Sequence, residues 1–409
     1  MERVLEGVRV LEVSAWAFVP SAGAVLADWG ADVIKVEPPT GDPMRGLISG
    51  GIGGGGGPSF PWEIWNRGKR SVALDLTHPQ AREIALNVAA GADVFLTSYL
   101  QPTRRKLGLD IDDVRAVNPS IVYGCGTGQG PLGEEADKGG YDSISFWARG
   151  GVAATVTPPG VERPVGQPGG AFGDSLSGMA LAGGIAAALL RRERTGEGAI
   201  VDVALLGTAM WSLQMSIVGA AAMMAAAAAG GGSPSTPAGI QLFNPLVNNY
   251  KTADGRWLAL CMLQRDLYWD GVLVALGRED LRADDRFSTP EALGSHIGEA
   301  VAELEEAFAS LTLEEARAAL GSQPGQWDVL QNVLELPADP QAIANGYAQP
   351  VSYDGDLVLP LISAPAQFDR TPPPLGQAPG FGAHTDEVLA ELGMDEDQIM
   401  EAKIAGAVV

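Results

Sequence analysis

Val8-Arg-Val-Leu-Glu-Val13 and Asp32-Val-Ile-Lys-Val-Glu37 are two short apolar runs, and an apolar helix pattern at 21–29 separates them. Runs of this length, rich in Val, Ile and Leu, are typical of buried strands. Gly30 ends the helix pattern, and two prolines at 38–39 stop the second run. Because a strand, a helix and a further strand in this order form the building unit of parallel sheets, we predict that a parallel sheet begins here.

The same alternation continues through the next part of the chain. Further strand patterns cover 71–76, 93–97 and 120–124, and Pro79 opens a helix pattern at 79–90. Repeated alternation of strands and helices predicts an α/β fold with a Rossmann-like parallel sheet and helices on its faces.

The later part of the chain has a different pattern. A hairpin pattern at 251–260 turns at Asp254-Gly255, and helices rich in Ala, Leu and Glu follow at 297–320. We therefore expect a second, smaller domain of the α+β type, after which strand patterns return beyond Tyr347.

Acidic residues outnumber basic ones by a wide margin. The 409 residues include 50 Asp and Glu against 27 Lys and Arg, which gives a formal net charge of −23. Such a charge repels nucleic acid, so we expect no nucleic-acid partner. A small anionic ligand can still bind where cations gather, as they do at 67–70, 104–106 and 191–194.

Three features bear on cellular location. The two cysteines, Cys125 and Cys261, provide no disulfide framework, and the start of the chain does not resemble a signal peptide. No charged residue occurs at 203–250, a length that would allow a membrane span. Polar residues interrupt this stretch at 212–216 and prolines break it at 233–237, so we predict a buried helix and a loop. A cytoplasmic protein without a membrane segment is expected.

The sequence lacks the usual motifs for metals, dinucleotides and serine nucleophiles. None of its three histidines lies at metal-ligand spacing from another histidine or a cysteine. A run of alternate glycines at 124–130 misses the G-x-G-x-x-G spacing of dinucleotide-binding loops, and no G-x-S-x-G elbow occurs. We expect neither a metal site nor a permanently bound cofactor.

With those motifs missing, a carboxylate is the catalytic group that the sequence offers. Asp174, in the stretch Gly173-Asp-Ser-Leu-Ser-Gly178, stands immediately before an apolar helix pattern at 179–190. It is either the N-cap of that helix or a functional acid, and the two roles do not exclude each other. The positive end of the helix dipole would keep a partly buried carboxylate ionised. An ionised, poorly hydrated carboxylate is the nucleophile that acyl transfer through a mixed anhydride needs.

Motifs spread over almost the whole chain carry a family resemblance. They are Leu5-Glu-Gly-Val-Arg-Val-Leu-Glu-Val13, the segment 23–39, Asn66-Arg-Gly-Lys-Arg-Ser-Val-Ala-Leu-Asp75, Gly139-Gly-Tyr-Asp142, Gly173-Asp174 with its helix and Thr195-Gly-Glu-Gly198, and Pro379-Gly-Phe-Gly-Ala-His-Thr-Asp-Glu-Val-Leu389. Together and in this order they resemble the family III CoA-transferases, the CaiB/BaiF family that includes formyl-CoA transferase.

The resemblance implies an interlocked homodimer in which each chain forms an open ring threaded by the other. It implies a large CoA-binding domain of residues 1–205 and 335–409, with a linker and a small domain at 206–334. It also places a set of residues around CoA, namely Lys69, Arg70, Val72, Ser98, Tyr99, Arg104 and Lys106. Cationic side chains suit this ligand because CoA carries phosphates.

The resemblance also implies a mechanism. Asp174 attacks the thioester of an acyl-CoA donor, which forms an aspartyl anhydride and free CoA thiolate. The thiolate returns to give an aspartyl-CoA thioester, and an acceptor carboxylate then takes over the CoA. Tyr141 matches a family active-site tyrosine and would orient the carboxylate or the acyl group. Gly230, Gly231 and Gly232 would correspond to a flexible loop that shields the intermediates from water.

Two departures from the formyl-CoA branch bear on the substrate. Where that branch has a glutamine near its start, this chain reads Trp16-Ala17-Phe18, and where it has one five residues after the tyrosine, this chain has Phe146. Both changes replace polar groups by apolar ones, so formate and oxalate are poor candidates. We expect Trp16, Ala17, Phe18 and Phe146 to line a pocket for a medium or bulky apolar or 2-hydroxy acyl group.

Two alternative functions stay open. The α-methylacyl-CoA racemases share the fold and use a histidine–aspartate pair, but Tyr141 stands where the histidine is expected. Racemisation needs two acid–base groups, and tyrosine is a poor base near neutral pH. The other alternative is a non-catalytic acyl-CoA-binding protein, in which Asp174 only caps its helix.

Overall fold

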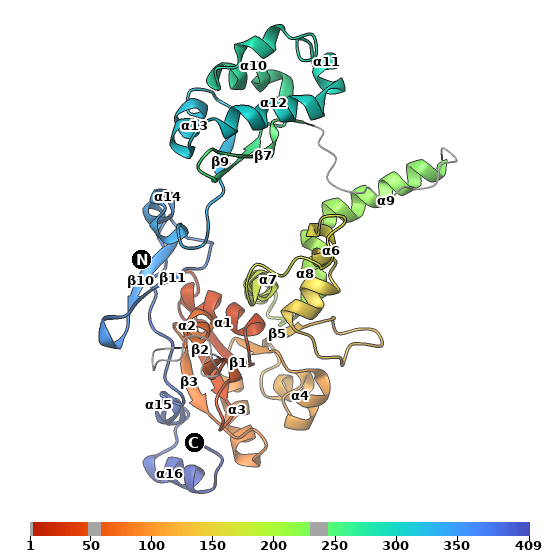
Figure 1. Ribbon diagram of the computed structural model, residues 1–409. Helices are drawn as coiled ribbons and strands as arrows, with labels where there is room; N and C mark the ends of the chain where they lie inside the picture. The colour runs from red at the N-terminus through yellow and green to blue at the C-terminus, as the bar shows by residue number, and fades with distance from the viewer. Residues whose placement is uncertain (1–2, 48–58, 230–243) are drawn as a thin grey trace. The chain divides into compact units, whose positions relative to one another are not determined.

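The computed structural model describes residues 3–47, 59–229 and 244–409 (Figure 1). It divides into two compact units, one of Met1–Gly232 with Pro340–Val409 and one of Ser233–Asp339. The chain from 205 to 229 is helical and belongs to the larger unit, although 206–229 was expected in the linker and small domain. The predicted loop glycines 230–232 lie outside the described residues.

The larger unit is built on a sheet of six parallel strands, which confirms the predicted α/β fold. The strands are β1 (Arg9–Val13), β2 (Asp32–Glu37), β3 (Arg70–Ala73), β4 (Val94–Thr97), β5 (Val122–Thr127) and β6 (Ile200–Ala204). They lie in the order β3-β2-β1-β4-β5-β6. In the pairing register Leu11 lies between Ile34 and Phe95, so the carboxyl ends of β1 and β4 are neighbours at one edge.

Helices cover both faces of this sheet (Figure 1). Since successive strand residues point to opposite faces, Val10 and Leu96 pack beneath one layer and Leu11 and Phe95 beneath the other. The first layer contains α1 (Phe18–Asp28) and α7 (Phe172–Thr195). The second contains α3 (Pro79–Ala90), α5 (Ile111–Val117), α15 (Thr385–Glu391) and α16 (Glu396–Ile404).

A glycine allows α1 and α7 to approach each other closely. A Cβ atom at Gly178 would collide with Oγ of Ser21 and crowd the carbonyl of Phe18. With no side chain in the way, the Ser21 hydroxyl donates to the backbone carbonyl of Asp174 at 3.2 Å. The first turn of α7 is therefore fixed against α1.

Among the described helices, α7 is long and apolar enough to cross a membrane by length and composition, and so are the bent pair α8 (Leu205–Ser212) and α9 (Gln214–Ala229) if taken together. The residues Leu181, Ala182 and Ile185 of α7 are fully buried against the sheet layer, as in a core helix of a globular protein. The axes of α8 and α9 differ by 64°.

The end of the chain returns to the sheet. The N–H of Val409 donates to the carbonyl of Ala73 at 3.2 Å, and the N–H of Asp75 donates to the carbonyl of Ala407 at 3.0 Å. The carboxyl-terminal segment therefore lies beside the edge strand β3.

The other elements of the larger unit are shorter. They are η1 (Pro43–Arg45), α2 (Phe60–Asn66), α4 (Gln101–Leu107), η2 (Asp142–Ala148), α6 (Val152–Val156), α14 (Pro340–Ala344), the antiparallel pair β10 (Ala348–Ser352) and β11 (Val358–Ile362), and η5 (Asp354–Asp356).

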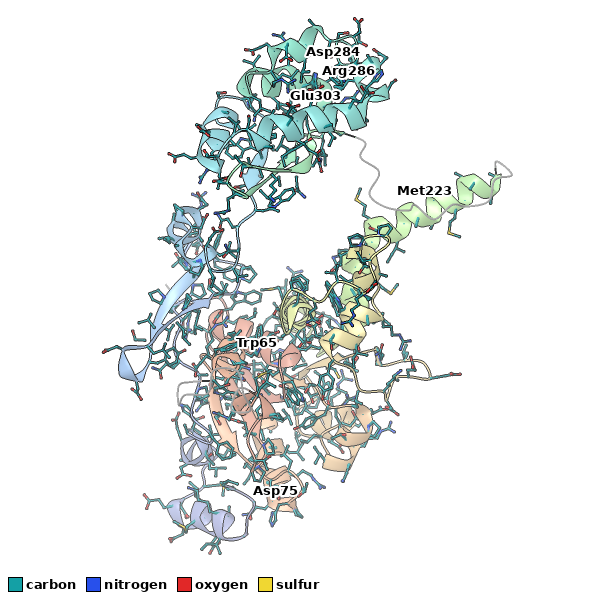
Figure 2. The ribbon with its side chains drawn as sticks, in the orientation of Figure 1. Trp65, Asp75, Met223, Asp284, Arg286 and Glu303 are labelled. Atoms are coloured by element: carbon teal, nitrogen blue, oxygen red, sulfur yellow. The ribbon has the colours of Figure 1, made fainter. Side chains whose placement is uncertain are left out.

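The smaller unit has an antiparallel sheet covered by helices, as the α+β prediction required. The sheet contains β7 (Val247–Lys251), β8 (Trp257–Cys261) and β9 (Trp327–Val329). The helices are α10 (Arg265–Ala275), η3 (Glu279–Ala283), α11 (Pro290–Ser295), α12 (Ile297–Ala309), α13 (Leu313–Leu320) and η4 (Leu336–Ala338). Tyr250 stacks on Phe308 in its core at 4.9 Å, and Arg286 pairs with Asp284 and Glu303 on its surface (Figure 2).

Candidate active site

The strand order of the sheet changes direction between β1 and β4. Open parallel sheets bind ligands outside the carboxyl ends of the strands at such a point. A cavity of about 320 Å³ lies there. Its lining comes from the segments after β1, β4 and β5 and from the start of α7, and it includes Ala15, Trp16, Phe18, Ser98, Tyr99, Gly126, Tyr141, Asp174 and Leu205.

Asp174 is the third residue of α7 and does not cap it. The residue before the helix is Ala171, whose φ of 61° is left-handed, and no side chain caps the helix from that position. Asp142 takes over part of this role, because its Oδ1 accepts the N–H of Gly173 at 3.0 Å. The alternative in which Asp174 serves as the helix N-cap is therefore wrong.

The surroundings of Asp174 favour its neutral form. Burial, together with the smaller effect of the negative charge of Asp142, raises the pKa of Asp174 to about 7. We expected the helix dipole to keep this carboxyl group ionised, but the loss of hydration outweighs the dipole. A carboxyl group with a pKa of about 7 is partly ionised at neutral pH, and its anion is poorly solvated.

Trp16 and Tyr141 face each other across the cavity lining. Their ring centroids lie 5.8 Å apart with the planes at 88°. The Tyr141 side chain is 55% exposed, so its ring is free to meet a ligand. Trp16 has a φ of 70°, a left-handed conformation that is uncommon for a bulky side chain.

Close packing explains the alternate glycines that miss the dinucleotide motif. A Cβ atom at Gly126 would collide with the side chains of Val19 and Phe18, and one at Gly128 would collide with the backbone of Gly140. These glycines let β5 and the loop after it approach the wall of the cavity.

The structure brings two of the four expected pocket residues to the cavity. Trp16 and Phe18 line it. Ala17 is 2% exposed and packs against Met44 and Trp62 instead. Phe146 is 1% exposed, and its ring lies against Gly173, behind the start of α7. The last two residues therefore support the wall of the cavity from behind.

Ser98 and Tyr99, expected at CoA, also line the cavity. Ser98 follows β4, and its Oγ accepts the N–H of Ala15 at 3.0 Å. That bond joins the segment after β4 to the segment after β1.

Three other residues expected at CoA lie elsewhere. The ammonium group of Lys69 is buried and pairs with Glu12 at 2.7 Å. Arg70 opens β3 and pairs with Asp32 at 2.6 Å, at the amino edge of the sheet, whereas the cavity is at the carboxyl edge. Val72 is 1% exposed in the core. The structure does not bring these three side chains to the cavity.

Arg104 and Lys106 belong to α4, beside the cavity. Arg104 lines a small neighbouring cavity of about 70 Å³, which shares Leu100 and Thr127 with the first. Its guanidinium group donates to Oδ1 of Asp110 at 2.9 Å and to the carbonyl of Tyr99 at 2.7 Å. Lys106 is exposed on the same helix.

The sequence analysis did not predict that Asp142 holds the start of α7. The residue was quoted in the motif Gly139-Gly-Tyr-Asp142, but nothing in that motif indicates that its carboxylate bonds to α7. Its Oδ2 also accepts from Nε2 of Gln167 at 2.6 Å, and burial raises its own pKa. A contact of this kind becomes visible only when η2 and α7 are placed side by side.

The groups that can ionise at the cavity are carboxyl and phenol groups. Its ionisable side chains are Asp174, Tyr99 and Tyr141. Across the described ranges no cluster of three or more His, Cys, Asp and Glu side chains has the arrangement of a metal site. The cavity therefore offers one carboxyl group and two phenol groups that can ionise.

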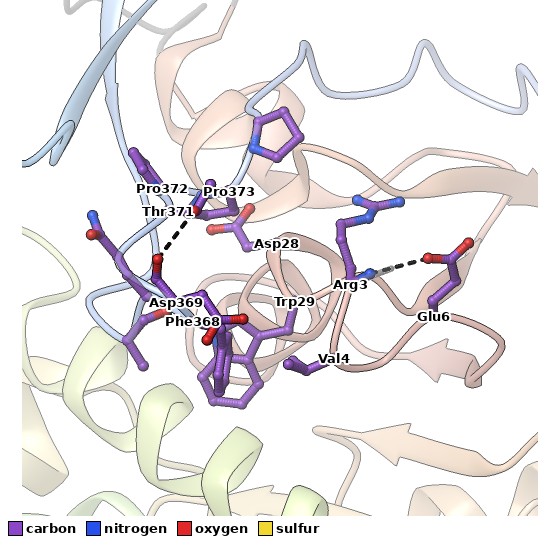
Figure 3. A pocket seen from close by; sticks show the side chains of 13 residues that line it. Arg3, Val4, Glu6, Asp28, Trp29, Phe368, Asp369, Thr371, Pro372 and Pro373 are labelled. Atoms are coloured by element: carbon purple, nitrogen blue, oxygen red, sulfur yellow. Dashed lines mark hydrogen bonds between the residues drawn. The ribbon is translucent and has the colours of Figure 1, made fainter. Parts of the chain in front are cut away.

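A larger cavity of about 460 Å³ lies near the amino ends of β1 and β2 (Figure 3). Trp29, Phe368 and a run of prolines at 372–374 line it. Its buried acid, Asp28, is bound by Arg67 at 2.7 Å and by the N–H of Ala364 at 2.9 Å. Because this cavity is at the amino edge and its buried carboxylate is occupied, it is a weaker candidate for catalysis.

Comparison with known proteins agrees with the motifs. Residues 5–385 match the family described as CoA-transferase family III. The chain is 32% identical to (R)-2-hydroxy-4-methylpentanoate CoA-transferase of Clostridioides difficile, over 98% of each chain. It is 32% identical to cinnamoyl-CoA:phenyllactate CoA-transferase of Clostridium sporogenes, over 97% of this chain and 95% of that one. The crystal structure of a CaiB/BaiF family protein from Brucella suis superposes with a TM-score of 0.79 at 28% identity, covering 96% of this chain and 100% of that one.

Proposed function

The chain belongs to CoA-transferase family III, and from this we propose that it moves CoA between carboxylic acids with Asp174 as the nucleophile. One observation carries the proposal. Asp174 is the only carboxyl group among the described residues that line the cavity at the carboxyl edge of the sheet. A poorly hydrated carboxylate in that position is suited to attack a thioester.

The proposed transfer proceeds in four steps, and each step accounts for the bond formed and the group that leaves. An ionised oxygen of Asp174 attacks the donor carbonyl, CoA leaves as the thiolate, and a mixed anhydride forms. The thiolate attacks the aspartyl carbonyl of that anhydride, releases the donor acid and leaves Asp174 as a CoA thioester. The acceptor carboxylate attacks this thioester and expels CoA thiolate, which forms a second anhydride. The thiolate then attacks the acceptor carbonyl, which gives the new acyl-CoA and restores the Asp174 carboxylate.

The lining of the cavity favours a medium or bulky apolar or 2-hydroxy acyl group. Trp16, Phe18 and Leu205 contribute apolar surface, and Tyr141 contributes a hydroxyl on an exposed ring. The two relatives described above are named for 2-hydroxy acids, which supports the same class. Tyr141 would orient the acyl group or the carboxylate of Asp174.

CoA would extend from the cavity over α4. Ser98 and Tyr99 line the cavity on that side, and Arg104 lies in the adjoining cavity. Exposed Lys106 would meet a phosphate group of CoA. Lys69, Arg70 and Val72 are left out of this proposed site, since their side chains are paired or buried elsewhere.

A transfer assay tests the proposed activity. The protein would be incubated with CoA thioesters of 2-hydroxy, aryl and short straight-chain acids, each with a free acid as acceptor, and new acyl-CoA species would be identified by mass spectrometry. We expect transfer among the 2-hydroxy and aryl pairs. Exchange of the α-proton of a 2-methylacyl-CoA without any movement of CoA would indicate a racemase, and binding without either reaction would indicate an acyl-CoA-binding protein.

The pH profile of the transfer should report on Asp174. Since only the ionised carboxylate attacks, kcat/KM for the donor is expected to rise through a pKa of about 7 and to level off above it. Asp142→Asn removes the neighbouring charge while keeping an oxygen for the N–H of Gly173, so it should shift this rise to lower pH. A profile that is flat from about pH 5 to 9 would contradict the assignment.

We also propose that two copies of the chain associate in a homodimer. Helix α9 carries no charged residue, and none of its described residues is buried. The side chains on these two helices are largely exposed: Trp211 of α8 is 71% exposed, and Met215 and Val218 of α9 are 88% and 66% exposed. Met223 also projects from α9 (Figure 2). Exposed apolar surface of this extent is uncommon on monomers and typical of contact surfaces.

Sedimentation can test the dimer. The wild-type chain is expected at twice its mass of 42.4 kDa. Met215→Lys combined with Val218→Lys should shift the protein toward the mass of one chain. Met400→Lys, at a methionine on α16 that is 57% exposed, serves as the control and should not. A wild-type protein that sediments as one chain would overturn the proposal.

A further inference from the structure

A buried group of charges lies behind the wall of the cavity. Glu12, Lys35, Asp42 and Lys69 are each at most 4% exposed. The Nζ of Lys35 lies 3.0 Å from an oxygen of Glu12 and 3.0 Å from an oxygen of Asp42. The Nζ of Lys69 lies 2.7 Å from the second oxygen of Glu12. The two positive and two negative charges balance, but burying ion pairs seldom adds net stability, so stability alone does not account for this group.

The two lysines hold the backbone after β1 and in the first turn of α1. Lys35 donates from Nζ to the carbonyl of Ser14 at 3.0 Å. Lys69 donates from Nζ to the carbonyl of Pro20 at 2.9 Å. Between these two points lie residues 15, 16 and 18, which line the cavity. The buried charges therefore fix both ends of a segment that forms part of the cavity wall.

Asp42 holds the middle of that segment. Its Oδ1 accepts the N–H of Trp16 at 3.3 Å and the N–H of Met44 at 2.9 Å, while Oδ2 faces the ammonium group of Lys35. Trp16 has the left-handed φ of 70°, which is unfavourable for a non-glycine residue and persists only where the surroundings impose it. This conformation places the indole against Tyr141 at the cavity.

We propose that Asp42 is a positioning residue that acts through Trp16 to set which acyl groups fit beside Asp174. Lys35 fixes Asp42, Asp42 holds the backbone N–H of Trp16, and the indole supplies the apolar wall that a bulky acyl group contacts. The inference rests on the proposed role of the Asp174 cavity.

A matched pair of variants separates this role from simple stabilisation. Asp28, like Asp42, is buried, is ion-paired to a cation and accepts a backbone N–H. It does not line the cavity that contains Asp174. Asp42→Asn and Asp28→Asn therefore remove equivalent charges, one behind Trp16 and one remote from it.

The readout is the ratio of kcat/KM for a bulky aryl acyl-CoA donor to that for a short straight-chain donor. In Asp42→Asn we expect this ratio to fall about tenfold, mainly through KM for the bulky donor, whereas Asp28→Asn should leave it within about twofold of wild type. A double-mutant cycle with Trp16→Gly follows the coupling: once the indole is gone, Asp42→Asn should no longer change the ratio.

Equal ratios in Asp42→Asn, Asp28→Asn and wild type would overturn the inference, and so would an Asp42→Asn effect that persists in the Trp16→Gly background. If Asp42→Asn yields too little folded protein, Lys35→Met with Asp42→Leu removes the pair without leaving a lone buried charge and is subject to the same criterion. Failure of the proposed function is separate, because it would show as transfer activity retained by Asp174→Asn.

Discussion

Asp174→Asn is expected to lower kcat/KM for CoA transfer at least about a thousandfold, because asparagine cannot form the anhydride and thioester intermediates. The change conserves shape and adds no bulk to the cavity. Asp142 continues to hold the N–H of Gly173, so the start of α7 should keep its place. Asp28→Asn is the matched control and should retain transfer within about threefold of wild type.

The same variant should be more stable than the wild type, which separates a lost nucleophile from a lost fold. The folded-state pKa of about 7 lies above the ordinary value of 3.8, so the unfolded chain releases this proton first as pH rises. The free energy of unfolding of the wild type therefore falls between about pH 4 and 7 because of this group. Over the same window the difference in free energy of unfolding in favour of Asp174→Asn grows to about 1–3 kcal/mol. A variant that is inactive but less stable at pH 8 would point to misfolding.

Lys35→Met is expected to lower the free energy of unfolding of the larger unit by about 3–5 kcal/mol, the typical cost of leaving a buried charge without its partner. Lys35 is the cation between Glu12 and Asp42, and both carboxylates lie within 3.0 Å of it. Burial alone would lower the pKa of Lys35, but these two carboxylates together raise it, so the folded protein holds the charged form. After the substitution Glu12 retains Lys69, whereas Asp42 is left buried and without its cation.

Two further variants test that explanation. Arg191→Met breaks an ion pair with Glu197 in which the side chains are 52% and 69% exposed, and it should cost less than about 1 kcal/mol. Lys35→Met with Asp42→Leu should recover more than half of the stability lost in Lys35→Met. Urea unfolding followed by circular dichroism provides the comparison, and a loss for Lys35→Met no larger than that for Arg191→Met would contradict the buried-charge account.

The parallel sheet was predictable because its central strands are continuous apolar runs. Nearly all residues of β1, β2 and β4 are buried. A strand that is covered on both faces has apolar residues at nearly every position, and this continuous run is visible in the sequence. The edge strand β6 was missed, since its residues are exposed or only partly buried and include Asp202. The strand order, and with it the position of the cavity, depends on contacts between segments that no local pattern contains.

A position at the cavity was predictable where a residue stands shortly after a strand or at the start of a helix. Trp16, Ser98 and Asp174 are of this kind, and all three line the cavity. Lys69 was expected at CoA, but its ammonium group turns inward to Glu12, a residue 57 positions earlier in the chain. No sequence pattern around 66–75 indicates that partner. Phe146 was expected to line the pocket, but it lies in the π-helix η2 and its ring packs against Gly173.

The covalent intermediate on Asp174 is the most direct test of the account. The wild-type protein would be mixed with a 2-hydroxyacyl-CoA donor that it turns over, treated with hydroxylamine, and digested for peptide mass mapping. Hydroxylamine converts an activated side-chain carboxyl to a hydroxamate, and we predict that modification on Asp174, dependent on the donor and missing from Asp174→Asn. Steady turnover with the hydroxamate on another residue, or on none, would contradict the assignment of Asp174 as the nucleophile.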